Sequence, residues 1–369
     1  MKILLSFNDA YAPHAATVVT GLIKNSSQKL SIVVLYYSLK AETIEKFVTY
    51  YEKRLASIEF IKVEIEPKLS ERLKSIRSPM YLQGRIEPWL RLFASSYIQD
   101  DYVVWLDCDT VVTGDICKIL DEVDNQYLIS ACKEYDPLYK NNLRNLKLLD
   151  KWILPDKWED CLIAEAHFYR LYNYYGIPHN VPYFCSGVMY MNLKKWREEE
   201  FESQLIKKIY DTDYFFAVDQ DALNCVIKGQ FGFLTPQWNV MMESTRKCLA
   251  NYDIKQIEDS LVSPGIVHLW GLGKPWNENC GGIYRKKYWD YRLDTPWPAK
   301  PNWKRRLKNK YRIVNSFARF IGFVKRVTSP SPKNASIVET SFLNERGAHK
   351  TYMITDENSI SRDVHLQRC

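Results

Sequence analysis

Two aspartates separated by one residue follow a short, strongly apolar segment, Val103 to Leu106. In an extended chain, side chains two residues apart point to the same side, so the carboxylates of Asp107 and Asp109 converge while Cys108 faces away. Paired carboxylates at a strand end can bind Mg²⁺ or Mn²⁺, and a nucleoside diphosphate can complete the coordination. The same spacing occurs twice more within residues 211–221, so the preceding buried strand is what makes this pair a candidate metal site.

A histidine and a lysine near the end of the main part of the chain form a second candidate group. His268 follows the apolar pair Ile266-Val267, and Lys274 lies soon after it in a loop rich in glycine and proline. An imidazole at a strand end can supply a third metal ligand, and a lysine on such a loop can reach a phosphate. We therefore expect both side chains to join the aspartates.

The elements that must position these residues alternate in type. Hydrophobic periodicity predicts strands at 3–5, 31–37, 59–65 and 102–106, alternating with helices that begin at 13, 41 and 88. This order indicates an α/β nucleotide-type domain with a mostly parallel sheet and helices on both faces. Ligands of such sheets bind at the carboxyl ends of strands, where Asn8, Asp9, Asp107 and Asp109 lie.

The second half of the chain is less regular. Residues 135–180 are rich in Tyr, Asn, Trp and Lys with weak periodicity, which favours an irregular insertion or lid. A strand at 188–191, a helix over 194–210 and a helix that begins at Asp219 follow. A last short strand covers Ile266-Val267.

The positive charge is concentrated in one segment. The chain has a net charge of +7, and nine basic residues with no acidic one lie between Trp303 and Arg326, so the rest is close to neutral. This distribution argues against a nucleic-acid-binding domain. Apolar residues in 303–326 recur at helical spacing, which predicts a basic amphipathic helix on an anionic membrane surface; the alternative is a terminal helix packed on the domain.

Domain limits and location follow from the same patterns. We predict a catalytic domain at 1–300, a membrane-associating helix at 301–327 and a mobile polar tail at 328–369. The nine cysteines form no C-x-x-C pair, which is typical of reduced thiols, and neither a leader-peptide core nor an apolar run of spanning length is present. We expect a cytoplasmic protein, peripheral on the inner face of the cell membrane.

Five segments, in this order, resemble glycosyltransferase family 8, the retaining group that includes bacterial lipopolysaccharide galactosyl- and glucosyltransferases and glycogenin. They are ILLSFNDAY (3–11), RLF (91–93) before WLDCDTVVTGDI (105–116), YFCSGVMYMNLKKWR (183–197), DQDALN (219–224) and HLWGLGKPW (268–276). The resemblance implies a GT-A type fold, Rossmann-like, with a UDP-sugar donor and Mn²⁺, Mg²⁺ being the alternative metal.

The resemblance also implies a role for individual residues. The metal ligands are Asp107, Asp109 and His268. The residues that contact the nucleotide are Asn8, Asp9, Tyr11, Cys108, Gly271, Gly273 and Lys274. The residues that contact the donor sugar are Cys185, Ser186, Asp219 and Gln220. The catalytic residues are Arg91, Asp219 and Gln220. Cys185 stands where the family usually has Asn, which bears on sugar identity, and Asn8 stands where an acidic residue is common.

These observations predict a metal-dependent transfer of galactose or glucose from a UDP-sugar to a glycan acceptor, such as a lipid-linked lipopolysaccharide or another cell-surface glycan. Two mechanisms are open. In the first, the acceptor's proton passes to the leaving diphosphate; in the second, a double displacement, Gln220 acts as a nucleophile. We favour the first because an amide is a weak nucleophile. The alternatives are a non-catalytic UDP-sugar-binding module and a sugar nucleotidyltransferase. The loop after the first strand has neither the glycine nor the basic residue of the latter.

Overall fold

The structure is a computed structural model of the chain. The residues that it describes are 1–78, 84–137, 168–169, 171–241, 251–270, 274–277, 283–301, 335–344, 347–356 and 362–365. The chain divides into two compact units, each considered by itself. The first comprises Met1–Trp276 and Cys280–Lys300, and the second comprises Asn277–Asn279 and Pro301–Cys369.

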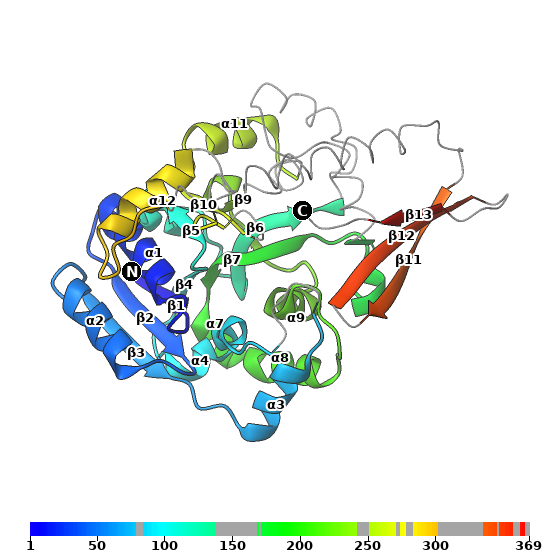
Figure 1. Cartoon of the computed structure of the whole chain (residues 1–369), viewed down its shortest axis with the longest axis horizontal. Coiled ribbons are helices and arrows are strands. Elements are labelled where there is room, and N and C mark those ends of the chain that lie inside the picture. The colour runs from blue at the N-terminus through cyan, green and yellow to red at the C-terminus, as the bar shows by residue number, and fades with distance from the viewer. Residues whose placement is uncertain are drawn as a thin grey trace. The chain divides into compact units, whose positions relative to one another are not determined.

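In the described part of the first unit, seven strands form one sheet in the order β3-β2-β1-β4-β7-β6-β8 (Figure 1). The strands from β3 to β4 are parallel, β7 is antiparallel to both β4 and β6, and β8 is parallel to β6. The mostly parallel α/β sheet predicted from the sequence is confirmed. The strands are β1 (Lys2–Ser6), β2 (Ser31–Tyr36), β3 (Ser57–Lys62), β4 (Val103–Leu106), β6 (Ile129–Tyr135), β7 (Tyr183–Met191) and β8 (Gly232–Phe233).

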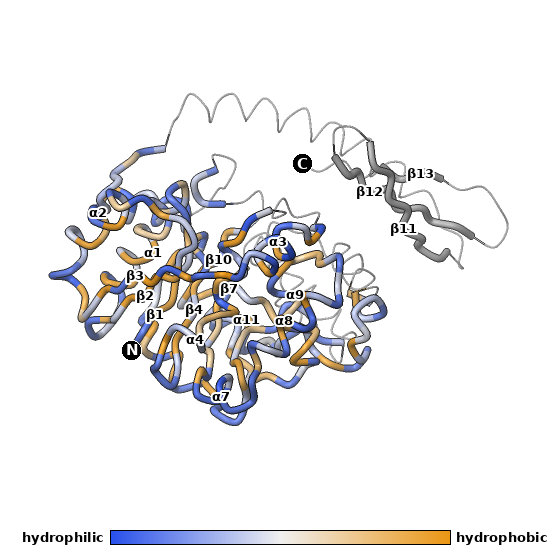
Figure 2. The backbone as a smooth tube through the Cα atoms, turned by 90° about the horizontal axis from the view of Figure 1, so that it is seen from below, coloured by the Kyte–Doolittle hydropathy of each residue, from blue (hydrophilic) through white to orange (hydrophobic). Residues whose placement is uncertain are grey.

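Helices cover both faces of this sheet because successive strand residues point to opposite sides. Ile3 and Leu5 of β1 belong to one apolar cluster with α1 and α2, whereas Leu4 belongs to another with η1, α3, α8 and α9. The residues of the central strands are accordingly mostly apolar, as the hydropathy colours of the backbone show (Figure 2). The helices and 3₁₀ helices of the unit are α1 (Ala12–Asn25), α2 (Ala41–Tyr51), α3 (Pro67–Ser75), η1 (Glu87–Phe93), α4 (Ala94–Tyr97), η2 (Ile116–Asp121), α7 (Leu193–Glu198), α8 (Phe201–Tyr210), α9 (Val218–Ile227), η5 (Pro236–Asn239), α11 (Ile254–Val262) and α12 (Ile283–Leu293).

A smaller sheet of three described strands lies beside the carboxyl end of β4. It has the order β5-β10-β9, formed by β5 (Thr110–Val112), β10 (Ile266–His268) and β9 (Val240–Met241). Since β5 begins directly after the two aspartates, this sheet places β10 against them.

The predicted helix over 194–210 is divided into α7 and α8. The backbone of Glu200, which precedes α8, is left-handed with φ of 50°, so one continuous helix cannot pass through it. Tyr172 and Tyr175 of the predicted insertion pack into the core, and most of that insertion lies outside the described residues.

The second unit contains an antiparallel sheet of three described strands, β11 (Ala335–Asn344), β12 (Gly347–Asp356) and β13 (Arg362–His365). These strands lie within the range 328–369, for which the sequence predicts a tail without regular structure. The basic segment 303–326 lies outside the described residues. The domain limits and the membrane-associating helix therefore stay predictions.

The buried strand β1 offers a test of the fold. Leu4 is fully buried, so Leu4→Ala leaves a cavity and we expect it to lower the free energy of unfolding by about 2–5 kcal/mol. Glu59→Gln on the exposed side of β3 is the control and is expected to change it by less than about 0.5 kcal/mol. Urea unfolding followed by circular dichroism measures both. Equal midpoints for the two variants would contradict the packing described.

Candidate active site

The two sheets bring the predicted metal ligands together. The backbone N–H of Asp107 donates to the Gly187 carbonyl of β7 at 2.8 Å, which fixes the end of β4. In the small sheet His268 is paired with Thr110, and the N–H of Leu269 donates to the Asp109 carbonyl at 3.0 Å. Pairing of β5 with β10 therefore places the imidazole beside the second aspartate.

Asp107, Asp109 and His268 form a compact set of metal-type ligands. One ligand atom from each lies within 4.8 Å of the other two. The His268 Nε2 lies 3.2 Å from Asp109 Oδ1 and 3.9 Å from Asp107 Oδ2. At Gly187 an added Cβ would lie 2.2 Å from the imidazole Cε1, so only glycine leaves room for this ring.

Arg91 links Asp107 to Asp219, an acidic residue of α9. Its guanidinium donates to Asp107 Oδ1 at 2.8 Å and pairs with Asp219 Oδ2 at 3.1 Å. It also donates to the Ser186 carbonyl at 2.6 Å and lies 4.0 Å from the centre of the Trp105 ring. Arg91 is only 4% exposed, so these contacts occur with little screening by water.

Among the described residues, the two oxygens of Asp107 have different surroundings. Its Oδ1 accepts from both Arg91 and the Trp105 indole N–H, each at 2.8 Å, whereas Oδ2 faces His268. The side chain is therefore held in one orientation, with Oδ2 directed to the candidate metal position.

Lys274 contacts the other aspartate. Its Nζ donates to Asp109 Oδ2 at 2.7 Å. Burial alone would raise the pKa of Asp109, but Lys274 and His268 together hold it below the ordinary value. Burial would lower the pKa of His268 and of Lys274, and the Asp109 carboxylate raises both. The described site thus balances its negative and positive groups.

An aromatic stack fixes the segment that carries Lys274. The Trp276 ring lies parallel to the His14 ring of α1, with 3.7 Å between centroids, and meets the Tyr11 edge. The His14 Nδ1 lies 2.6 Å from the Tyr288 hydroxyl of α12. Burial lowers the pKa of His14 to about 3, so this histidine is neutral at physiological pH.

Asp219 and Gln220 lie in the first turn of α9 and face the start of β7. Asp219 accepts from the Ser186 hydroxyl at 3.3 Å in addition to its pairing with Arg91. The Gln220 Oε1 accepts from the Ser186 backbone N–H at 2.9 Å, while its Nε2 donates to Glu134 Oε2 at 2.8 Å. The amide of Gln220 is therefore held at both ends.

A buried carboxylate lies directly behind Gln220. Asp221 is fully buried and accepts hydrogen bonds from the hydroxyls of Tyr175 and Tyr183, and Tyr183 also accepts from Gln220 Nε2 at 3.2 Å. Burial raises the pKa of Asp221, and the two tyrosine hydroxyls oppose that shift. These contacts link Gln220 to the core beneath α9.

Three of the residues predicted to bind the nucleotide lie in the turn between β1 and α1. The Asn8 amide donates to Glu87 Oε1 at 3.2 Å, Asp9 accepts from the N–H of Lys40 at 3.2 Å, and Tyr11 lies just before α1. Cys108 differs from the others because it belongs to the apolar core, where its thiol contacts the Ser6 carbonyl at 3.6 Å.

The remaining predicted residues divide into two groups. Cys185 is buried, and its sulfur lies 4.0 Å from His268 Nδ1. Gly271 and Gly273 lie outside the described residues. Three further side chains contact the site and are not among the predicted site residues: Trp105, Glu134 and Asn239. Glu134 and Asn239 act through contacts between segments that are distant in sequence, which spacing along the chain does not reveal, whereas Trp105 lies two residues before Asp107.

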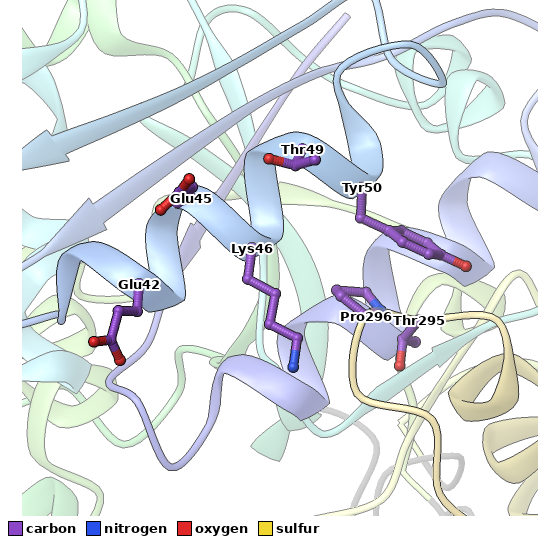
Figure 3. A pocket seen from close by; sticks show the side chains of 7 residues that line it. All are labelled: Glu42, Glu45, Lys46, Thr49, Tyr50, Thr295 and Pro296. Carbon is purple, nitrogen blue, oxygen red and sulfur yellow. The ribbon is translucent and has the colours of Figure 1, made fainter.

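A surface pocket elsewhere in the unit contains none of these residues. It is lined on one side by Glu42, Lys46 and Tyr50 of α2 and on the other by Thr295 and Pro296 (Figure 3). This pocket is therefore separate from the candidate active site at the strand ends. In the described part of the chain, no helix combines the length and apolar character needed to cross a membrane.

The buried Asp219 generates a prediction about pH. Burial raises its pKa from 3.8 to about 7, although Arg91 opposes the shift. Between about pH 4 and 7 the folded protein therefore holds a proton that the unfolded chain has lost, so this group makes stability fall as pH rises. Asp219→Asn removes the effect, which amounts to at most ~1.4 kcal/mol per pH unit.

Urea unfolding at a series of pH values measures this difference. We expect the stability of Asp219→Asn relative to the wild type to increase from pH 4.5 to 7.5, about the interval between the two pKa values. Asp211→Asn, at an exposed position after α8, is the control for the loss of a carboxylate elsewhere on the chain. Parallel pH profiles for Asp219→Asn and the wild type would refute the raised pKa.

Comparisons with known proteins test the predicted family, and the solved structures among them confirm the predicted GT-A type fold. The model of the family described as "Glycosyl transferase family 8" matches residues 2–280. General stress protein A of Bacillus subtilis is 24% identical over 308 residues, covering 80% of this chain and 94% of its own. The lipopolysaccharide 1,2-glucosyltransferase of Escherichia coli is 27% identical over 218 residues, covering 57% and 54%.

The fold is also found among solved structures. The galactosyltransferase LgtC, solved in complex with donor and acceptor sugar analogues, superimposes with a TM-score of 0.60 at 18% identity, covering 83% of this chain and 99% of its own. The bifunctional glycosyltransferase WbbM gives a TM-score of 0.57 at 20% identity, covering 83% and 52%. The sequence match, the shared fold and the cluster of metal-type ligands lead to one conclusion: the chain belongs to glycosyltransferase family 8.

Proposed function

We propose that this glycosyltransferase moves a hexose, galactose or glucose, from a UDP-sugar to a glycan acceptor with retention of configuration. The observation that carries the proposal is the convergence of Asp107, Asp109 and His268 beside Arg91 in a family 8 chain. Membership of the family supports the reaction class, and the three metal-type side chains support a bound metal.

The residues present fit a divalent cation. Two carboxylates and one imidazole combine hard oxygen ligands with a nitrogen ligand, a set that suits Mn²⁺ and admits Mg²⁺ less readily. Asp107 and Asp109 supply the carboxylates and His268 the imidazole. A cation bound there neutralises the charge that develops on the leaving diphosphate.

The nucleotide would lie along the carboxyl ends of β1 and β4. Asn8, Asp9 and Tyr11 lie in the β1–α1 turn, where they can receive the uracil and ribose. Lys274 lies close to the aspartates, with its Nζ 5.6 Å from the centre of the Tyr11 ring. Its ammonium can exchange the Asp109 carboxylate for the diphosphate and stabilise the leaving group.

The donor sugar would lie between the start of α9 and the start of β7. Asp219 and Ser186 provide polar contacts there, and Cys185 takes the place where the family usually has Asn. Gln220 Oε1 accepts from the Ser186 backbone N–H, which occupies one of its two lone pairs and makes a weak amide nucleophile weaker still. We therefore favour transfer on one face, with the acceptor proton passing to the leaving diphosphate, over a double displacement through Gln220.

For the acceptor we propose lipopolysaccharide or another cell-surface glycan carried by a lipid. The similarity to a lipopolysaccharide glucosyltransferase supports this acceptor class. The basic segment 303–326, with apolar residues at helical spacing, supports contact with an anionic membrane at its cytoplasmic face.

Release of UDP tests the reaction directly. Purified protein is incubated with UDP-galactose or UDP-glucose, with Mn²⁺ or with EDTA, and UDP is measured by a coupled assay. We expect slow release with one sugar, abolished by EDTA and lowered at least ~100-fold in Asp109→Ala, because the leaving group loses its stabilising charge. Lys118→Ala, on η2 away from the cluster, is the control.

The outcomes separate the proposal from its alternatives. If the protein binds the UDP-sugar but forms no UDP from it, with or without a glycan acceptor, it is a UDP-sugar-binding module. Formation of a nucleotide sugar from UTP and a sugar phosphate would indicate a nucleotidyltransferase.

Membrane contact is tested with vesicles. We expect the full chain to sediment with vesicles containing phosphatidylglycerol and to remain in solution with pure phosphatidylcholine. The triple variant Arg305→Glu, Arg306→Glu, Lys308→Glu loses about 1 kcal/mol of attraction to the anionic lipid per basic residue. Its binding to the vesicles should therefore fall by roughly 100-fold or more. If this triple variant sediments like the wild type, the segment does not bind the membrane through its charge.

A further inference from the structure

Asn239 contacts the metal-type histidine from the side opposite the aspartates. Its Oδ1 lies 3.0 Å from His268 Nδ1, and the two residues are only 3% and 4% exposed. We propose that Asn239 is a positioning residue, which holds His268 in the tautomer and orientation that a metal ligand requires. This inference rests on the proposed function, because it assumes that the cluster binds a cation.

The contact is a consequence of strand pairing. Asn239 ends the 3₁₀ helix η5, and β9 follows it directly. In the small sheet β9 runs parallel to β10, with Val240 paired to Val267 and Met241 to His268. The pairing that brings the imidazole to the aspartates therefore also brings the amide to the imidazole.

The chemistry of the two groups determines the tautomer. An amide oxygen only accepts hydrogen bonds, so Nδ1 must carry the hydrogen. The lone pair of neutral His268 then lies on Nε2, which faces Asp109 Oδ1 at 3.2 Å. A ligating histidine needs this arrangement, with one ring nitrogen free for the metal and the other donating to an oxygen.

Other groups around the ring are weaker partners for Nδ1. The Cys185 sulfur lies 4.0 Å away, at the limit of a sulfur hydrogen bond, and Gly187 contributes no side chain. The Asn239 Nδ2 has no hydrogen-bond partner in the described part of the chain. Replacing the amide by an apolar group therefore removes the bond to His268 and no other described hydrogen bond of that side chain.

Mn²⁺ binding by the full chain provides the test. Free Mn²⁺ is followed by its electron paramagnetic resonance signal, with and without UDP, in the wild type, Asn239→Leu and Asn239→Asp. We expect Asn239→Leu to raise the Kd for Mn²⁺ about 10- to 100-fold, as is typical when such a partner is lost. Asn239→Asp keeps an acceptor at the same place and should retain the affinity.

Asn25→Leu is the matched control. Asn25 also makes internal hydrogen bonds, to the carbonyls of Gly21 and Val112, but lies at the end of α1. It should lower stability without changing the Kd for Mn²⁺. Equal Mn²⁺ affinity of Asn239→Leu and the wild type would overturn the role of Asn239, as would an equal loss in Asn239→Asp. Failure of the wild type to bind Mn²⁺ would instead overturn the proposed metal site and this role with it.

A second measurement needs no variant. Long-range ¹H–¹⁵N spectra of the Mg²⁺-loaded wild type distinguish the two tautomers of a histidine ring. We expect His268 to carry its hydrogen on Nδ1. A hydrogen on Nε2 in this state would show that Asn239 does not set the tautomer, even if Asn239→Leu failed to fold.

Discussion

An alternating row of charges at the carboxyl edge of the sheet is the feature on which the site depends. Asp219 pairs with Arg91, Arg91 with Asp107, and Asp109 lies between His268 and Lys274, with contacts of 2.7 to 3.2 Å. Removing one member of a buried ion pair typically costs about 3–5 kcal/mol, because its partner is left without compensation. The row therefore holds three acidic side chains close together, and it places positive groups where the proposed reaction would need them.

This row requires the whole first unit, because its members come from separate segments of the chain. The end of β4 provides two carboxylates, η1 the guanidinium, α9 the third carboxylate and β10 the imidazole. Parallel β1 and β4 place their carboxyl ends at one edge, and antiparallel β7 brings its own start to that edge. The small sheet then folds β10 back against the aspartates. The candidate metal ligands lie at strand ends, and Lys274 lies in a segment that the stacking of Trp276 on His14 anchors.

Much of this could be predicted from the sequence, because strand-end chemistry is local. The apolar run before Asp107 and the short strand before His268 mark both as strand-end residues, and the order of elements indicates the sheet. Contacts that depend on tertiary packing could not be predicted. The Asn239 contact needs the pairing of β9 with β10, and the orientation of Gln220 needs Glu134 and Ser186, which are distant in sequence. The break between α7 and α8 depends on the left-handed backbone of Glu200, a residue that usually continues a helix.

The most direct test is to locate the metal. Crystals grown with UDP and MnCl₂ would be measured on both sides of the manganese absorption edge, so that anomalous scattering identifies each bound ion. We expect a peak at the first unit's strand ends, within coordination distance of one oxygen of Asp107, one oxygen of Asp109 and Nε2 of His268, together with oxygens of the diphosphate. A peak bound by other residues, or bound UDP with no manganese beside these three side chains, would contradict the site.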